Sequence, residues 1–467
     1  MLPEGLCNAL CSLNGGEPKL TFTSWYRIRR STGEVILDPK DPNGPRFAKT
    51  VIQSCCRFSY EEVQDILDGV EIPLTKRPTV FHDRWEMLEK DIFLLYDVCS
   101  KIRAKRFDHG SVRIDKNKMR FKLNEDDVPI SYQYESHSAS HWMIEELMLL
   151  SNEVVAMKLC EIGDSAVLRR HPPPDPKGFG ELSAKIKSQL NMEAWYGSTS
   201  RKLFESLQRV KGDLGPKIGQ LIEFLVMKTM RPAEYCSFRS GDPHHYALSF
   251  DFYTHFTSPI RRYPDIMVHR QLQTVLELGA CGIDLLTNPS LAPSEKDIVS
   301  IEAQCTLCNA MKKKSREAQE SCDVSFFCIY LRNKLEVNVS RGTVMSITEK
   351  CLNIYVPKLG KDCPVFFNLT SKVPDWYLRG DALRAELDSI LKGPQSIIYV
   401  NPNEAIIRWT SDDVRKVQVF DSLAVVIVPL ETVPISFTTV LLPPGHAKFG
   451  ESDSAESDEN NGVFIDH

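Results

Sequence analysis

The first two thirds of the chain carry hydrophobic residues mostly at intervals of three and four positions, the spacing of one face of an α-helix. Helices are predicted over residues 60–67, 84–105, 142–159, 178–230 and 294–330. The fourth of these is predicted to break near residues 212–216, which hold glycine and proline. Strands are predicted at 22–27 and 49–53, and a strand pair over 107–123. This part of the chain therefore mixes helices with short strands.

The pattern changes to an alternation of apolar and polar residues beyond residue 333. Short strands are predicted near 337–339, 352–356, 397–400, 405–409 and 417–420. About five short strands within roughly 100 residues are typical of a small barrel, so an all-β OB-fold barrel is predicted over residues 334–435. The last segment, 436–467, is rich in acidic residues and serine, which predicts a disordered acidic tail.

The composition is that of an ordinary globular protein, and it restricts where a nucleic acid could bind. Of the 467 residues, 42% are hydrophobic and 25% are charged, and the formal net charge is -5. A nucleic-acid site must therefore come from local patches of Lys and Arg. The 14 cysteines follow no regular framework, which favours reduced thiols and a cytosolic or nuclear setting. No apolar run approaches the roughly 20 residues of a membrane span, and the first residues do not resemble a signal peptide.

Residues 254–265 carry the densest set of reactive and binding side chains in the chain. They are predicted to form an irregular loop, stiffened by Pro259, that runs into a helix. Arginine presents donors that fit phosphate oxygens, aromatic rings stack on unpaired bases, and hydroxyls add phosphate contacts. The backbone of single-stranded RNA is therefore a natural ligand. The alternative is that Arg261 and Arg262 pair with Asp265 or other acids and only hold the helix in place.

The same loop resembles the RNA-clamping signature of the RNase II, or RNB, family of 3′→5′ exoribonucleases, T-S-P-I-R-R/K-Y/F-x-D-x-x-x-H-R. Residues 257–265, followed by His269 and Arg270, fit that pattern. The one departure is Pro264, where the family usually has a small residue. Further segments resemble the family in the same order, at residues 1–13, 59–63, 106–115, 144–152 and 169–172. The resemblance covers roughly residues 1–330 and points to the eukaryotic branch that degrades oligouridylated RNA without the exosome.

The resemblance implies an RNB-type α/β core over residues 1–333, in which helices surround an incomplete mixed sheet, and processive exoribonuclease activity on single-stranded RNA. Arg261 is expected to clamp the scissile phosphate. Tyr60 and Glu145 are expected to contact the terminal ribose, Glu145 at the 2′-hydroxyl that distinguishes RNA from DNA. The other expected RNA contacts are Arg113, Thr257, Ser258, Arg262, Tyr263 and Gln319.

The resemblance also implies Mg²⁺, which activates water and steadies the leaving oxygen. The family holds it with aspartates in a D-x-x-x-x-x-D-x-D-D arrangement, several tens of residues before the segment that matches residues 1–13. We therefore expect these ligands to lie before Met1, and no metal ligand is predicted within the chain. The acidic cluster at 124–127 is predicted to be a solvated hairpin turn. Two accounts stay open: a start codon taken at an internal methionine of a longer gene, and a genuine short form that binds RNA without cutting it.

Three weaker patterns can be explained by ordinary structural roles. Cys305 and Cys308 form a lone C-x-x-C on an apolar helix stripe, which favours buried core thiols over a zinc site. His137 and His141 have a spacing that could chelate a metal, but the sequence around them lacks further ligands. The basic run 312–316 is either a solvated face or an RNA-backbone contact.

These observations together predict a cytoplasmic monomer that binds single-stranded RNA and does not enter a membrane. The leading interpretation is an exoribonuclease core followed by the barrel and the tail. The alternative is a non-catalytic RNA-binding or regulatory protein.

Overall fold

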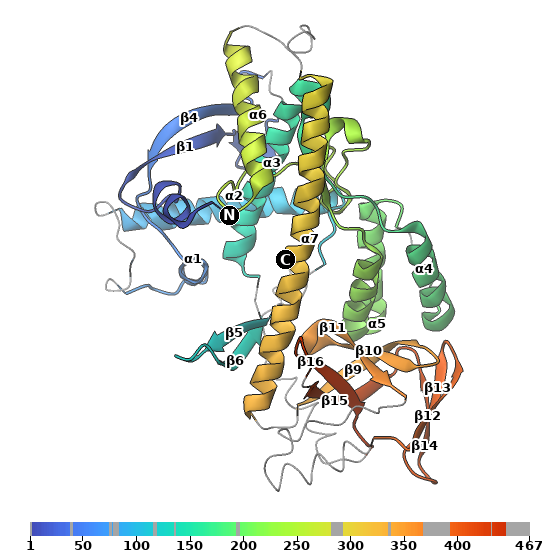
Figure 1. Cartoon of the computed structure of the whole chain (residues 1–467). Helices are drawn as coiled ribbons and strands as arrows, with labels where there is room; N and C mark the ends of the chain where they lie inside the picture. Colours follow the sequence, from blue (N-terminus) through green and yellow to red (C-terminus); the bar gives the residue numbers. More distant parts are fainter. Residues whose placement is uncertain are drawn as a thin grey trace.

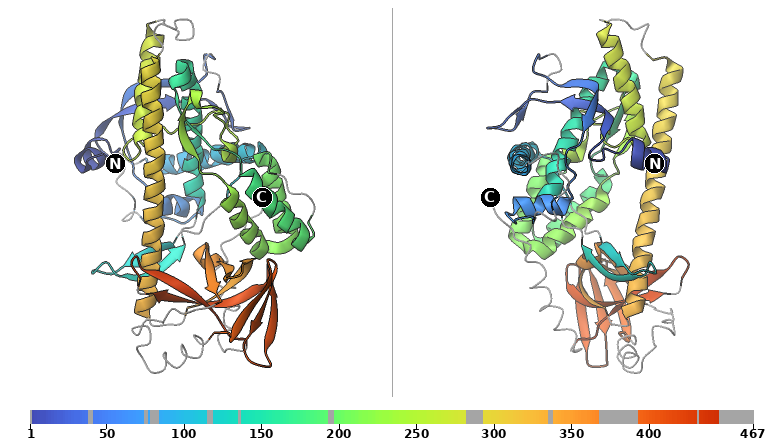
Figure 2. Two further views of the ribbon diagram at one scale, coloured as in Figure 1. Left: turned by 45° about the vertical axis from the view of Figure 1, so that its right-hand side comes forward. Right: turned by 90° about the vertical axis from the view of Figure 1, so that its left-hand side faces the viewer.

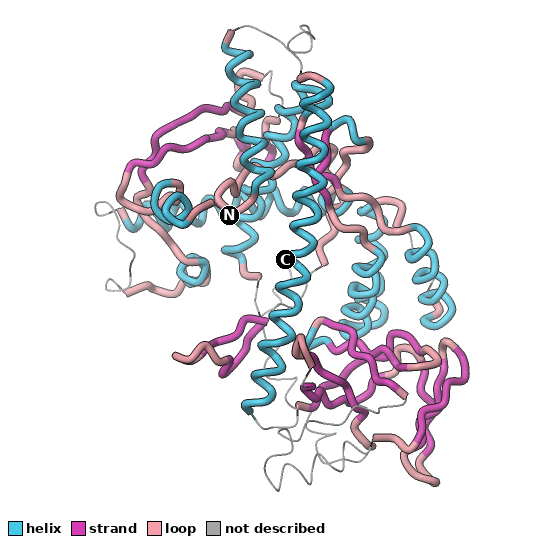
Figure 3. Tube along the Cα trace, viewed as in Figure 1, coloured by secondary structure: helices cyan, strands magenta, loops and turns pink. Residues whose placement is uncertain are grey.

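The structure is a computed structural model, and it describes residues 2–37, 41–73, 77, 84–114, 119–134, 137–192, 197–281, 293–334, 338–367, 393–430 and 432–444. Helices dominate the upper part of the molecule, and the strands that follow residue 338 gather at its lower end (Figures 1 and 3). Most of the segment predicted to be a disordered tail, residues 445–467, lies outside the described residues.

The helices agree with the sequence pattern to within a few residues at most ends, but the stretch predicted over 178–230 is also divided earlier, where one helix ends at Leu190 and the next begins at Ser200. The helices are α1 (Tyr60–Leu67), α2 (Trp85–Asp108), α3 (Ala139–Leu159), α4 (Pro176–Leu190), α5 (Ser200–Thr229), α6 (Tyr263–Ala280) and α7 (Glu295–Lys334). Short helical turns are η1 (Gly5–Leu10), η3 (Cys160–Ser165), η4 (Phe238–Ser240), η5 (Tyr246–Leu248) and η7 (Pro357–Leu359). Ser59 and Glu62 form a capping box at the start of α1. The predicted break in α5 occurs at Gly215, whose φ of 79° lies in the left-handed region that favours glycine.

The strands of the first 240 residues form separate antiparallel pairs. The pairs are β1 (Pro18–Trp25) with β4 (Arg46–Gln53), β2 (Ile28–Arg29) with β3 (Glu34–Val35), β5 (Met119–Leu123) with β6 (Pro129–Tyr134), and β7 (Val167–Arg170) with β8 (Glu234–Ser237). The structure therefore differs from the expected mixed sheet. The strands stay in separate pairs because they pack against helices. Phe22, Val167 and Tyr235, for example, share one buried cluster with residues of α3, α6 and α7.

The strand pair predicted over residues 107–123 is wrong in its first half. Helix α2 continues to Asp108, because its last turn carries Lys105 and Arg106, which suit the negative end of a helix. The pair that does form joins β5 to β6 around residues 124–127, where Asp127 has a φ of 59°. The acidic cluster is thus a hairpin turn, as predicted.

The strands beyond residue 338 form two antiparallel sheets that share one core. A five-stranded sheet has the order β11 (Lys361–Phe366), β10 (Cys351–Val356), β9 (Val339–Ile347), β15 (Ser422–Leu430) and β16 (Ser436–Leu441). A three-stranded sheet has the order β12 (Ser396–Asn401), β13 (Glu404–Arg408) and β14 (Val414–Gln418). Ile354 of the larger sheet and Ile407 of the smaller one are buried in the same cluster. The region is all-β, but closure into a barrel is not seen among the described strands. Strand β16 begins at residue 436 and lies wholly within the segment predicted to be a disordered tail, where it pairs with β15.

Helix α7 joins the two parts of the molecule. It runs beside α6 at its upper end and reaches β6 and the all-β region at its lower end (Figures 1 and 2). Cys305 is buried in the upper core, as the apolar stripe predicted, and Phe327 and Leu331 are buried in the lower core. Each of the 14 cysteines is a free thiol. None of the helices in the described ranges combines the length and the apolar character needed to cross a bilayer.

Candidate RNA-binding site

The signature loop is attached to the core at its first residues. The buried Thr254 hydroxyl donates to the backbone oxygen of Val167 at 2.7 Å. The Phe256 ring stacks on His269 of α6 with centroids 4.3 Å apart, and its backbone N–H donates to Asn152 Oδ1 of α3 at 2.8 Å. Three elements therefore fix the start of the loop before it reaches its arginines.

Asp265 fixes the end of the loop. Its side chain is completely buried, and Oδ1 accepts hydrogen bonds from the Ser258 N–H and from Arg262 Nη2, both at 2.7 Å. Pro264 occupies the first turn of α6, where a missing backbone N–H costs little. The loop therefore closes on its own helix, and residues 258–265 form one rigid turn.

The two signature arginines have different surroundings. Arg262 lies against the protein, with 24% of its side chain exposed, and forms the ion pair with Asp265. Arg261 is exposed, and its side chain makes only a long contact, 3.5 Å, to the Ser258 hydroxyl. The structural role that the sequence left open for both arginines thus applies to Arg262. Arg261 keeps its guanidinium available for a ligand.

Positive charge gathers behind the loop. Arg169 of β7 is buried with its guanidinium over the Tyr235 ring, 4.8 Å from the centroid. Desolvation, followed by the nearby Arg169 and Arg262, lowers the pKa of Lys312 on α7 to about 8. Arg169 Nη1, Arg262 Nε and Asp265 Oδ2 are buried atoms with no hydrogen-bond partner in the described structure. Unpaired donors in such a concentration of cations favour an anionic ligand.

A second group of candidate residues lies at the start of α3. Tyr60, the first residue of α1, stacks on His141 with ring centroids 4.0 Å apart and an interplanar angle of 16°. His141 in turn shares a 2.7 Å hydrogen bond between its Nδ1 and the Ser138 hydroxyl. The Ser140 N–H donates to Gln64 Oε1, which ties α3 to α1. These contacts hold the Tyr60 ring in place while 43% of the residue stays exposed.

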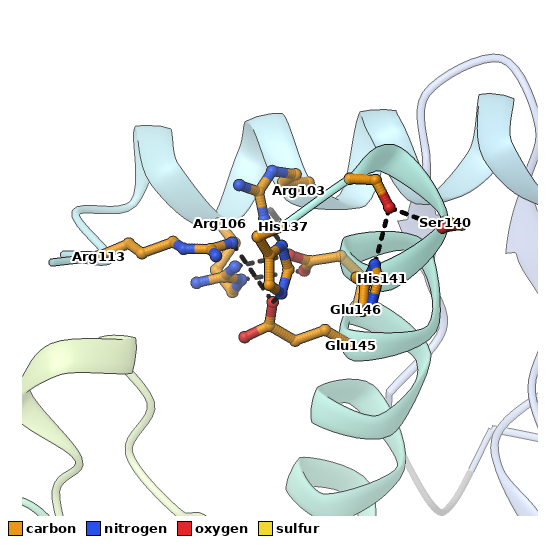
Figure 4. A network of polar contacts seen from close by, with 9 residues as sticks. Arg103, Arg106, Arg113, His137, Ser140, His141, Glu145 and Glu146 are labelled. Atoms are coloured by element: carbon orange, nitrogen blue, oxygen red, sulfur yellow. Dashed lines mark hydrogen bonds and ion pairs between the residues drawn. The ribbon is translucent and has the colours of Figure 1, made fainter. Parts of the chain in front are cut away.

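Glu145 and Arg113 belong to the same group (Figure 4). Arg113 Nη1 and His137 Nε2 each lie 3.5 Å from Glu145 Oε2. The neighbouring Glu146 faces the protein instead: it is 1% exposed and pairs with Arg106 at 2.5 Å and with Arg103 at 3.3 Å. The tandem acids are thus divided between an open site and a buried ion-pair network.

Helix α3 connects the signature loop with this second group of residues. Glu145 belongs to the second group, and Asn152 holds the signature loop at Phe256. The two residues are separated along the helix axis by roughly 10 Å, at 1.5 Å for each residue. A short stretch of extended single strand could therefore reach from one group to the other.

The remaining residues predicted to contact RNA do not all lie in these two groups. Thr257 and Ser258 contact the signature arginines, and the half-exposed Tyr263 donates its hydroxyl to Gln304 on α7 at 3.3 Å. Gln319 lies exposed on α7, about two helical turns beyond Lys312 and outside both groups. No role was predicted for Arg169, Arg103 or Arg106. Arg169 and Arg106 each begin a segment that resembles the family, at residues 169–172 and 106–115.

The residues present do not fit a divalent metal. Among the described residues, no group of three or more His, Cys, Asp or Glu is arranged to hold a metal ion. His137 and His141 have ring centroids 5.5 Å apart and take part in the contacts with Glu145 and Tyr60. The Mg²⁺ implied by the family resemblance therefore has no ligand set in this part of the chain, and we assign no chemical step to it.

One carboxyl near these groups makes stability depend on pH. Burial, and then the neighbouring Asp251 carboxylate, raises the pKa of Glu153 on α3 from 4.5 to about 7. The folded state therefore binds a proton more tightly than the unfolded chain between those values, so stability falls as pH rises through this window. The total loss is about 3 kcal/mol, and replacing Glu153 with Gln removes it.

Urea unfolding at pH 5 and pH 8 tests this expectation, with the Glu153→Gln chain beside the wild type. Glu161→Gln is the matched control, because that carboxylate is more exposed and pairs with Lys158 at the surface. An equal change between the two pH values in the wild type and in Glu153→Gln would contradict the assignment.

Comparison with known proteins places the chain in a family. The family model described as RNB domain matches residues 1–278, more than half of the chain. DIS3-like exonuclease 2 of Schizosaccharomyces pombe is 34% identical over 373 residues, which cover 77% of this chain and 38% of that protein. DIS3-like exonuclease 2 of Caenorhabditis elegans is 35% identical over 373 residues, 77% of this chain and 41% of that protein. The chain thus spans about two fifths of the length of these relatives.

A solved structure with a similar fold is Mycoplasma genitalium RNase R in complex with ribose-methylated single-stranded RNA. It superposes with a TM-score of 0.71 at 19% identity, over 94% of this chain and 60% of that one. Yeast Ssd1, described as a pseudonuclease, gives a TM-score of 0.65 at 19% identity over 95% of this chain and 59% of that one. These likenesses establish the RNB-type fold, and the family model with the curated relatives establishes membership. The chain belongs to the RNB family, to which the RNase II exoribonucleases belong.

Proposed function

We propose that this chain is the RNA-holding part of a 3′→5′ exoribonuclease of the RNase II type, which acts on single-stranded RNA, uridylated RNA included, in RNA decay. The exposed Arg261 contacts the scissile phosphate. Tyr60, Arg113 and Glu145 hold the terminal nucleotide, and Ser258, Thr257, Arg262 and Tyr263 shape the loop around the strand. The all-β region guides RNA inward, and the protein works as a cytoplasmic monomer.

The observation that carries the proposal is the difference between Arg261 and Arg262. A purely structural loop would use both arginines in internal ion pairs. Here Asp265 pairs with Arg262, while Arg261 is exposed and makes no ion pair in the described structure. A guanidinium held by a well-anchored turn suits a phosphate, because both its donors and its charge are available.

Replacing Arg261 with alanine is expected to weaken the binding of a fluorescently labelled oligouridine by about tenfold, the effect of losing one charge-assisted hydrogen bond. Fluorescence anisotropy in EDTA measures the dissociation constant without interference from cleavage. The thermal melting temperature should not change, since Arg261 makes no ion pair in the described structure. Binding should also weaken as salt rises, because Lys and Arg contacts to phosphates release counterions.

Two arginine variants make the result specific. Arg201→Ala removes an exposed arginine of α5 that pairs with Glu205, and it should leave RNA binding unchanged. Arg262→Ala should lower the melting temperature, because it leaves Asp265 buried without its ion pair. Equal losses of affinity in Arg261→Ala and Arg201→Ala would mean that any surface arginine contributes equally through its charge. That result would count against a specific phosphate contact by Arg261.

Cleavage is a separate question from binding. Phosphodiester hydrolysis needs strong compensation of negative charge, and the described residues offer no carboxylate cluster that could hold Mg²⁺. We therefore expect this chain, tested alone with Mg²⁺, to bind labelled oligouridine without shortening it. Release of mononucleotides that Arg261→Ala abolishes would refute this expectation and would make the chain a complete nuclease.

A further inference from the structure

Two histidines fill the space between Tyr60 and Glu145. His141 stacks under Tyr60, and its ring centroid lies 5.5 Å from that of His137. His137 Nε2 then lies 3.5 Å from Glu145 Oε2. The residues for which the family resemblance implies contact with a terminal nucleotide are thus linked by two side chains to which the resemblance gives no role.

The two oxygens of Glu145 have different surroundings. Oε2 is buried, lies 3.5 Å from both Arg113 Nη1 and His137 Nε2, and has no hydrogen-bond partner. The side chain as a whole is 36% exposed, and in Figure 4 its other oxygen points away from both neighbours. Two ion-pair neighbours that flank one buried oxygen restrict rotation of the carboxylate. The remaining oxygen is therefore presented in a fixed direction as a hydrogen-bond acceptor.

The other two arginines of the drawn network are engaged elsewhere. Arg103 and Arg106 of α2 both pair with the buried Glu146, at 3.3 Å and 2.5 Å. The ion-pair partners of Glu145 in the described structure are Arg113 and His137. A histidine is well suited to this position, since its second ring nitrogen can bond elsewhere while Nε2 faces the carboxylate.

His141 supports the neighbouring aromatic surface. Its ring lies nearly parallel to the Tyr60 ring and covers one face of it, and Ser138 fixes its Nδ1. Tyr60 remains 43% exposed, which leaves aromatic surface for a base. A tyrosine whose ring is already ordered loses less conformational entropy when a base stacks on it.

We propose that His137 and His141 are positioning residues for the 3′-terminal ribonucleotide of a bound RNA strand. His137, with Arg113, aims the Glu145 carboxylate at the 2′-hydroxyl of the terminal sugar. His141 holds the Tyr60 ring flat for the terminal base. The assignment rests on the proposed function, because it requires an RNA 3′ end to bind between Tyr60 and Glu145.

The two roles have different signatures in a binding experiment. The affinities of two oligouridines are compared by anisotropy in EDTA with the full chain, one strand ending in ribose and the other in 2′-deoxyribose. His137→Ala should reduce the preference for the ribose end by about tenfold, the effect of one charge-assisted hydrogen bond, while affinity for the deoxyribose end stays near that of the wild type. His141→Ala should weaken both strands equally, by about fivefold or more, because stacking does not depend on the 2′-hydroxyl.

Conservative and distant variants test whether the effects are merely structural. His137→Gln keeps an N–H donor and should retain most of the ribose preference. His244→Ala removes a histidine–carboxylate pair of the same kind, with Asp251 at 3.7 Å, away from the site, and should change neither affinity. Unchanged ribose preference in His137→Ala, or unchanged affinity in His141→Ala, would overturn the assignment and leave the proposed function intact. Failure of the wild-type chain to bind either strand would overturn both.

Discussion

Replacing Glu146 with alanine is expected to lower the free energy of unfolding by about 3–5 kcal/mol, the cost of removing one partner from a buried ion pair. Glu146 is 1% exposed, and both of its oxygens accept hydrogen bonds from Arg106. Arg106 has only 8% of its side chain exposed, so the variant leaves a guanidinium without its counter-charge in a nearly dry environment. Arg103 loses the same partner at 3.3 Å.

Urea denaturation measures this loss, and the adjacent acid supplies the control. Glu145→Ala should change the free energy of unfolding by less than about 1 kcal/mol, because that carboxylate is partly exposed and its neighbours can be solvated. The preference for a ribose 3′ end should show the opposite order. Glu145→Ala should lose more of this preference than Glu146→Ala, because Glu145 is the residue proposed to contact the 2′-hydroxyl. Similar stabilities for Glu146→Ala and Glu145→Ala would show that the buried network contributes little.

Glu145 and Glu146 also show how far sequence alone could go. The apolar spacing predicted helix α3, and consecutive residues on a helix point about 100° apart, so the two acids had to face different surroundings. The family resemblance gave Glu145 its role. The burial of Glu146 depends on Arg106, 40 residues away along the chain, and no local pattern predicts a contact between two helices at that separation.

The signature loop illustrates the same limit. Its residue types predicted both RNA contact and an internal ion pair, and the sequence could not distribute these roles between Arg261 and Arg262. Asp265 decides the matter, because its carboxylate also accepts the Ser258 N–H and thereby fixes which arginine can reach it. The all-β region is a parallel case: its alternating pattern predicted most strands, but their assembly into two sheets depends on which faces share a core.

Asp265→Ala is expected to lower the free energy of unfolding by about 3 kcal/mol and to weaken RNA binding more than Arg261→Ala does. The carboxylate is completely buried, and its removal leaves the Ser258 N–H and the partly buried Arg262 without their acceptor. Arg262 would then lie near Arg169 without its counter-charge. The loop is expected to open, and Arg261 would lose the rigid turn that presents it.

A double-mutant cycle separates the ion pair from the turn. If the pair dominates, Arg262→Ala combined with Asp265→Ala should cost clearly less than the sum of the two single variants, since the second change removes a charge already left unpaired. Asp265→Asn keeps an acceptor for the Ser258 N–H and should retain more of the RNA affinity than Asp265→Ala. Additive losses in the cycle, with full RNA affinity in Asp265→Ala, would mean that Arg261 acts independently of the turn. The loop would then be a passive connection to α6, and the case for a preformed phosphate clamp would fail.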